Sequence, residues 1–292
     1  PLPAMTRFEE PILVAVAAGA PPSLDPDLDR LLSRLRGEAG IDIRRARAGE
    51  SVNVTIEAVP RRELQRYVPQ AACFVVPRIT GWRDFTSNRR SSRTDWSQLQ
   101  RREEVSIFIP GDVSPQEIRD CLHEELAQAI GPLNDLYRLS DSVFNDDNFN
   151  TVLTGFDMLI LRTYYAPELR NGMTEDEAAR VLPAVLARLN PAGERAPATP
   201  LGPTPPEWAE AIQTALGAGR SQSVRRRAGL RAVEIAADQN WYDGRAAFSL
   251  YALGRLSMTS DPGRAIAAFI DAARIYRALP GYEVQAAHVS LQ

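Results

Sequence analysis

Residues 121–135 read Cys-Leu-His-Glu-Glu-Leu-Ala-Gln-Ala-Ile-Gly-Pro-Leu-Asn-Asp, and this stretch does most to decide the fold. Upstream of it, Ser114 and Glu117 have the spacing of a capping box, with a proline in the first turn. Gly131 supplies a stop signal, because glycine readily ends a helix. The sequence therefore predicts one well-defined helix over residues 115–130.

This helix comes close to a zinc-peptidase motif. An H-E-x-x-H motif starts at His123 but fails at its second histidine, where Ala127 stands. Shifted by one residue, the stretch follows the longer metzincin pattern H-E-x-x-H-x-x-G-x-x-H. Glu125 then takes the catalytic-base position and Gly131 the turn position. The first and fifth positions of the pattern lie one helical turn apart, so both can face one metal.

The three histidine positions of that pattern hold Glu124, Gln128 and Asn134, with Asp135 next. Zinc prefers imidazole, thiolate and carboxylate donors, and amide oxygens are poor substitutes. Without a metal, no water is acidified for Glu125 to use. We therefore expect a vestigial site with no catalytic residue, no cofactor and no bound metal. On spacing alone, a capped amphipathic helix with solvated polar side chains is the plain alternative.

A working hydrolase with unusual ligands is a second hypothesis. Glu124, Gln128 and Asp135 are all oxygen donors, which suit Ca²⁺, Mg²⁺ or Mn²⁺ better than zinc. Near-stoichiometric metal at this helix in protein purified without chelator would favour this hypothesis.

A third hypothesis concerns the polar stretch 81–102, in which arginines alternate with aromatic residues. Such a mixture can bind single-stranded nucleic acid. The residues are Arg83, Arg89, Arg90, Arg93, Arg101 and Arg102, with Trp82, Phe85 and Trp96. Acidic neighbours dilute this charge and the net charge of the chain is -3, so we expect a surface loop or partner-binding loop and no nucleic-acid partner.

Apolar runs and alternating apolar residues predict five strands, at 11–18, 41–45, 52–58, 71–76 and 105–109. Helices are expected at 25–38 and 61–67, and Thr154 and Thr174 cap two more.

The length of 292 residues suggests two domains. A proline-rich stretch at 191–206 is typical of a linker, so we expect domains at 1–190 and 207–292. The second domain is predicted as four helices, at 223–239, 243–257, 261–278 and 281–292. Their pairs recur at about 38 residues, close to a tetratricopeptide-like repeat, with a plain helical bundle as the alternative.

The chain has two cysteines, Cys73 in a predicted strand and Cys121 on the predicted helix. Two buried free thiols and one disulfide are both compatible with the sequence, because the Cα separation decides between them. A disulfide would indicate an oxidising compartment.

The motif string resembles a family of alphaproteobacterial extracytoplasmic proteins of unknown function. The string runs from Cys121 through Glu-Glu-x-x-Gln-x-x-Gly-x-x-Asn-Asp to Asp-Ser-Val-Phe-Asn-Asp at 141–146 and a helix ending in a tyrosine turn at 154–165. The resemblance covers roughly residues 10–185. The family in turn is similar to a degenerate metzincin, with Phe144 in the place of the Met-turn methionine.

This resemblance implies an α+β fold: a metzincin-like domain with a mixed twisted sheet and an active-site-type helix, followed by an all-α repeat domain. It also implies a Cys73–Cys121 disulfide, a secretion leader or lipid anchor before Pro1, and a periplasmic or membrane-tethered location. The expected function is a non-catalytic interaction or assembly protein of the cell envelope, with protein partners.

Overall fold

The computed structural model describes residues 2–69, 71–134, 136, 139, 141–145, 151–195, 202–217 and 220–292. The chain divides into two compact units. The N-terminal unit takes in Pro1–Asn134 and Thr151–Ala198, and the C-terminal unit takes in Asp135–Asn150 and Thr199–Gln292. The boundary after residue 198 falls inside the stretch predicted as a linker.

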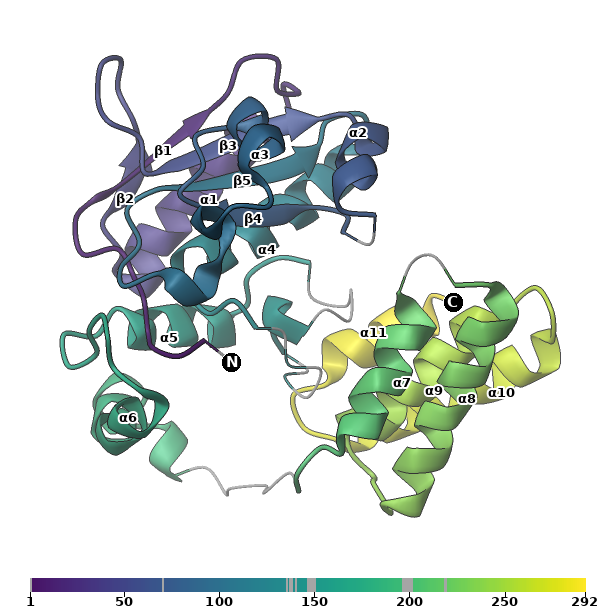
Figure 1. The fold of residues 1–292 in the computed structure, drawn as a ribbon. Helices are drawn as coiled ribbons and strands as arrows, with labels where there is room; N and C mark the ends of the chain where they lie inside the picture. Colours follow the sequence, from purple (N-terminus) through teal and green to yellow (C-terminus); the bar gives the residue numbers. More distant parts are fainter. Residues whose placement is uncertain are drawn as a thin grey trace. The chain divides into compact units, whose positions relative to one another are not determined.

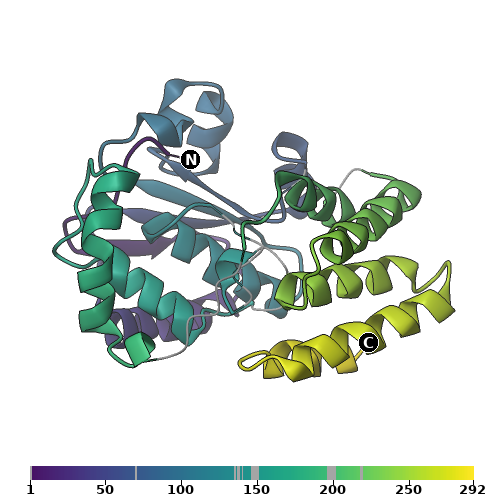
Figure 2. The ribbon, with the colours of Figure 1, turned by 90° about the horizontal axis from the view of Figure 1, so that it is seen from below.

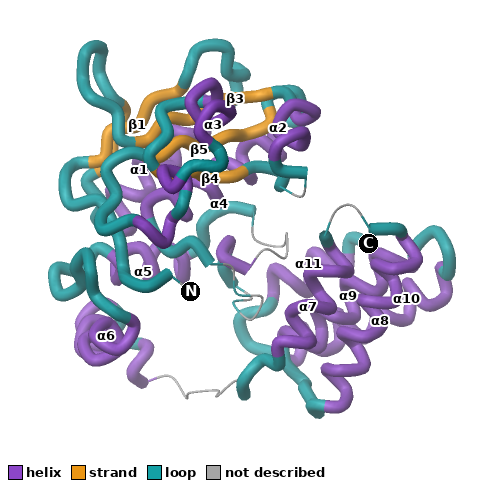
Figure 3. Tube along the Cα trace, in the orientation of Figure 1, coloured by secondary structure: helices purple, strands orange, loops and turns teal. Residues whose placement is uncertain are grey.

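The N-terminal unit is built on a five-stranded mixed sheet with the order β2-β1-β3-β5-β4, in orange in Figure 3. The strands are β1 (Ile12–Val16), β2 (Ile43–Arg45), β3 (Val54–Val59), β4 (Phe74–Pro77) and β5 (Val105–Pro110). Four strands are parallel, and the edge strand β4 runs antiparallel to β5. All five predicted strands are present, and the mixed sheet with its helices agrees with the expected α+β class.

Helices cover both faces of this sheet (Figure 1). They are α1 (Leu24–Ala39), α2 (Arg61–Tyr67), α3 (Trp82–Asn88), α4 (Pro115–Ile130), α5 (Gly155–Tyr164) and α6 (Glu175–Leu189). α1 and α4 contact each other and the sheet, and α5 packs against α1 and α6. α2 and α3 pack on the opposite face, through an aromatic cluster that includes Phe85 and Phe108.

The register of the strands explains this division. Val14 pairs with Val54, which pairs with Val105, so these side chains line one face in neighbouring strands. All three are at most 1% exposed, beneath α1 and α4. Because side chains alternate along a strand, Phe108 projects to the other face.

Helix α3 lies within residues 81–102, where the sequence predicted a loop, and that prediction is wrong for this helix. The N-terminal amide of the helix, from Trp82, donates a hydrogen bond of 2.6 Å to the carboxylate of Glu57 on β3. Phe85 is 6% exposed within the aromatic cluster. Both the cap and the apolar face depend on residues distant in sequence, so no local capping signal marks this helix. Two short 3-10 turns follow it, at Ser92–Thr94 and Trp96–Gln98.

The C-terminal unit is helical over its described residues. Its helices are α7 (Pro206–Leu216), α8 (Gln222–Asp238), α9 (Gly244–Ser257), α10 (Pro262–Ala278) and α11 (Glu283–Ser290). Consecutive helices lie side by side (Figures 1 and 2), and the last four fall where the sequence predicts them. Their assignment to a tetratricopeptide-like repeat stays a prediction.

An apolar groove of about 480 Å³ runs along α10 and α11. Ile266 and Ile270 line it and are 61% and 55% exposed. Among the described residues, we find no helix with the length and apolarity that a membrane span requires.

Candidate functional site

Helix α4 has the predicted bounds, and its start follows from local chemistry. The hydroxyl of Ser114 accepts a hydrogen bond from the amide of Glu117, as a helix cap does. The predicted capping box is incomplete, however, because the carboxylate of Glu117 forms an ion pair with Arg61.

The end of α4 is held by side chains from other elements. The last four carbonyls of a helix lack partners within it. In α4, the amide of Gly131 donates to Ala127, and the hydroxyl of Tyr165 donates to Ile130 at 2.8 Å. One Nη atom of Arg102 donates to the two remaining carbonyls, of residues 128 and 129, at 2.8 and 2.7 Å. The turn after α4 is therefore fixed in place by Arg102 and Tyr165.

Gly131 is required at this turn by space. A Cβ added to it would lie 2.5 Å from a methyl group of Leu161 in α5 and 2.9 Å from the carbonyl oxygen of Ala127. Leu161 is completely buried, so its side chain has little room to move. The glycine of the metzincin-like pattern thus allows close packing of α5 against the end of α4.

His123 is buried and holds the start of α5. Its Nδ1 accepts a hydrogen bond of 3.2 Å from the amide of Leu153, whose carbonyl accepts one from Arg34 at 2.9 Å. Burial, together with the charges of Arg34 and Arg119, lowers the pKa of His123 to about 4, against the opposing effect of Asp27. The folded chain therefore favours the neutral imidazole, whose Nδ1 can accept the hydrogen bond from Leu153.

This arrangement predicts acid sensitivity of the N-terminal unit. The pKa of His123 lies below its unfolded value of 6.5, so the unfolded chain binds the proton more readily. The histidine therefore stabilises the fold above pH 6.5, and this contribution is lost as pH falls toward 4. We expect a loss of about 3 kcal/mol over that window.

Urea unfolding of the wild type and of His123→Asn between pH 7.5 and 4 measures this effect. The amide oxygen of asparagine can accept from Leu153 but does not titrate. Parallel pH curves for the two proteins would contradict the prediction.

A disulfide joins α4 to the edge of the sheet. Cys73, one residue before β4, is bonded to Cys121, with a Cα–Cα distance of 5.9 Å. Phe74 pairs with Phe108, so Cys73 lies opposite Ile109 and projects to the face that α4 covers. The disulfide implied by the family resemblance is confirmed.

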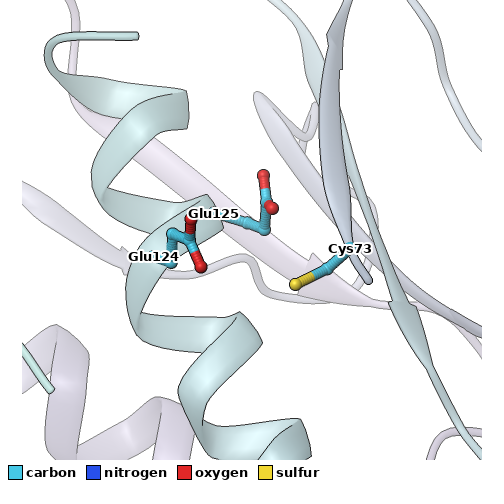
Figure 4. A group of neighbouring side chains, drawn as sticks. All are labelled: Cys73, Glu124 and Glu125. Atoms are coloured by element: carbon cyan, nitrogen blue, oxygen red, sulfur yellow. The ribbon is translucent and has the colours of Figure 1, made fainter. Parts of the chain in front are cut away.

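Glu124 and Glu125 lie beside this disulfide. One ligand atom from each of Cys73, Glu124 and Glu125 can be chosen so that all three lie within 4.8 Å of one another (Figure 4). Glu125 is 4% exposed, and Glu124 is half-buried. Helical spacing places Glu124 and Glu125 one turn from Cys121, but the sequence gives no sign that Cys73 joins them.

The other residues of the metzincin-like pattern differ in how far they are exposed to solvent. Gln128 is 9% exposed on α4, one turn beyond Glu124. Asn134 lies after the helix and is exposed. Asp135 falls outside the described residues. Within the part of the chain that the structure describes, the cluster of candidate metal ligands therefore involves Cys73 and the two glutamates rather than the three histidine positions.

The arginines of residues 81–102 make contacts within the chain. Arg93 pairs with Asp84, and Arg101 pairs with Glu103. Arg102 is 2% exposed and has a structural role at the end of α4. These contacts take up part of the positive charge on which the nucleic-acid hypothesis depends, and that hypothesis itself stays untested.

The chain matches a family model described as "Protein of unknown function (DUF2927)" over residues 2–184. The chain belongs to this family. No curated protein and no solved structure matches the chain.

The DUF2927 region contains the sheet, α4, the disulfide and both glutamates. It ends within α6, so helices α7 to α11 of the C-terminal unit lie beyond it. The expectation of a family of unknown function is thus confirmed, while the likeness to metzincins remains a hypothesis.

Proposed function

We propose that this DUF2927 protein is a non-catalytic interaction or assembly protein of the bacterial cell envelope, built on a metallopeptidase-like scaffold that has lost its zinc ligands. One observation carries the proposal. His123, the histidine of α4, is buried and accepts a hydrogen bond from Leu153. The second of the two histidines, His288, lies in α11 of the C-terminal unit. A site of three imidazoles cannot form from this chain.

Several features support the scaffold part of the proposal. The order β1-α1-β2-β3-β4-β5-α4 follows the order that the metzincin resemblance implies, apart from the short helices α2 and α3. Gly131 ends the helix, and α5 ends at Tyr164 with Tyr165 as its cap. The disulfide supports an oxidising, extracytoplasmic location.

The edge strand β4 is the binding surface we propose. The amide of Arg78 donates a hydrogen bond of 2.8 Å to the carbonyl of Glu104. Arg78 is therefore a residue whose backbone groups face β5 in the antiparallel ladder. Backbone groups of alternate residues point to opposite sides of a strand, so Val76 bonds to β5 while Val75 directs its amide and carbonyl outward. An extended peptide can add to such an edge. Pro77, which has no amide hydrogen, limits the pairing to the start of the strand.

A substitution at Val75 tests this proposal. Val75→Pro removes the outward amide, whereas Val75→Ala keeps it and removes only side-chain atoms. Peptides selected from a random library on the wild-type protein should bind Val75→Ala nearly as well. They should bind Val75→Pro about tenfold more weakly, since each backbone hydrogen bond contributes roughly 1 kcal/mol.

The same peptides test the hydrolase alternative. They are incubated with the protein in Zn²⁺, Mn²⁺, Ca²⁺ or Mg²⁺, and cleavage is followed by mass spectrometry. We expect the peptides to remain intact. Metal-dependent cleavage that Glu125→Gln abolishes would sink the non-catalytic proposal and favour a metal held by Glu124, Gln128 and Asp135.

A further inference from the structure

Four side chains with metal-binding chemistry meet where β4 approaches α4. Cys121, Glu124 and Glu125 occupy positions i, i+3 and i+4 of the helix, so they share one face. Cys73 comes from the start of the edge strand and is bonded to Cys121. Figure 4 shows Cys73 pointing toward the helix at the level of the two glutamates.

The spacing of these groups is close to that of a zinc site. Ligand atoms of Cys73, Glu124 and Glu125 lie within 4.8 Å of one another. In a tetrahedral zinc site with bonds of about 2.0 to 2.3 Å, ligand atoms are about 3.3 to 3.8 Å apart. Closing this difference requires a shift of about 1 Å in the carboxylate positions when the ion binds. The Cα–Cα distance of 5.9 Å between the cysteines also permits both sulfurs to reach one ion.

In the oxidised protein the two sulfurs are bonded to each other, and the thiolates that bind zinc are absent. We propose that reduction of the Cys73–Cys121 disulfide by a dithiol creates a four-ligand zinc site from Cys73, Cys121, Glu124 and Glu125. The inference is independent of the proposed function.

The dithiol gives two electrons and two protons to the disulfide, which becomes two thiols, while the dithiol itself becomes a disulfide. Zinc then binds the two thiolates, and their two protons are released. Reoxidation requires the sulfurs to leave the metal, so the disulfide and the zinc complex exclude each other.

The donor set indicates the metal and its role. Two thiolates favour zinc over Ca²⁺ or Mg²⁺, which take oxygen ligands. The charge of two thiolates and two carboxylates equals that of the four thiolates in common structural zinc sites. Four protein ligands leave no open position for water, so the site would be structural rather than hydrolytic.

Zinc itself is the probe for this proposal. It is titrated against a chromogenic chelator into the full chain, either oxidised or reduced with a phosphine. We expect one zinc per reduced chain and none in the oxidised chain. Cobalt(II) in place of zinc should give a sulfur-to-metal charge-transfer band in the reduced protein only.

Variants assign the ligands. Cys121→Ser should about halve the charge-transfer band at saturating cobalt, since the Cys73 thiolate remains, and weaken zinc binding at least about a hundredfold. Glu124→Gln and Glu125→Gln should each weaken it at least about tenfold. Glu117→Gln is the matched control, because Glu117 lies on α4 but pairs with Arg61, and its affinity should equal that of the wild type.

Three results would overturn the inference. The first is a reduced, folded chain that binds zinc no better than Cys73→Ser/Cys121→Ser. The second is tight binding that neither glutamate variant weakens, which would indicate a site of thiolates alone. If reduction unfolds the N-terminal unit, zinc should restore its helical circular dichroism, since metal binding is coupled to folding. Failure of zinc to restore it is the third.

Discussion

Replacing Arg102 with methionine is expected to destabilise the N-terminal unit by about 3 kcal/mol, because two buried helix carbonyls lose their donor. The guanidinium is 2% exposed and donates to the carbonyls of Gln128 and Ala129. It also donates hydrogen bonds to the hydroxyls of Thr6 and Tyr164. Methionine preserves much of the apolar packing of the stem, so the loss reports on the contacts of the guanidinium group.

The electrostatics of Arg102 explain why another cation will not replace it. Burial lowers the pKa of the guanidinium, and within the described residues no carboxylate forms a salt bridge with it. The partial negative charge at the C-terminus of α4 is its main compensation. The guanidinium also lies over the rings of Trp96 and Tyr164, at 5.1 and 5.9 Å from their centroids. A lysine at this position lacks both the planar group and the fixed pair of donors.

Arg101→Met is the matched control. Arg101 is adjacent in sequence, but its ion pair with Glu103 has side chains 64% and 65% exposed. Such pairs contribute less than about 1 kcal/mol. Urea unfolding, with hydrogen exchange at the α4 amides, should separate the two variants. Equal unfolding midpoints for Arg101→Met and Arg102→Met would show that Arg102 does not hold the helix end.

The difference between these two arginines illustrates what the sequence can predict. Both belong to the polar stretch 81–102, for which the acidic neighbours and the net charge of the chain favour a surface loop or partner-binding loop. The burial of Arg102 depends on the end of α4 lying beside it, which no local pattern encodes. Helix α3 escaped prediction for the same reason, because Glu57 caps it from β3.

The bounds of α4, by contrast, follow from the sequence to the residue. Ser114 marks its start through a local hydrogen bond, whereas Gly131 marks its end because Leu161 leaves no room there for a Cβ. The strands are located less sharply, since pairing sets where a strand begins. β2 begins at Ile43 and β4 at Phe74, both later than the alternation of apolar residues indicates.

In the candidate site, too, some features follow from local sequence and others depend on contacts between distant residues. The position of Glu124 and Glu125 one turn from Cys121 follows from helical spacing. The proximity of Cys73 to them depends on the register that places Cys73 opposite Ile109, under α4. Sequence reasoning from the metzincin pattern led instead to Gln128, Asn134 and Asp135, which that register does not involve.

Loss of the disulfide is expected to destabilise the N-terminal unit by about 4 kcal/mol, through the entropy of the unfolded chain. Cys73 and Cys121 are separated by 48 residues, and a closed loop of this length restricts the unfolded ensemble strongly. The double variant Cys73→Ser/Cys121→Ser and the reduced wild type should unfold at similar urea concentrations. Chelator is present throughout, so that a metal cannot stabilise the reduced wild type or the double variant.

The double variant also provides the control for the reductant. The chain has two cysteines, both in this disulfide, so reductant should leave the unfolding of the double variant unchanged. A difference below about 1 kcal/mol between oxidised and reduced wild type would contradict the prediction. That result would mean that burial of α4 and the backbone ladder of β4 and β5 already fix this edge. The peptide-binding surface at Val75 would then not depend on the disulfide, whereas a large loss would make the edge strand and α4 one covalently stabilised element.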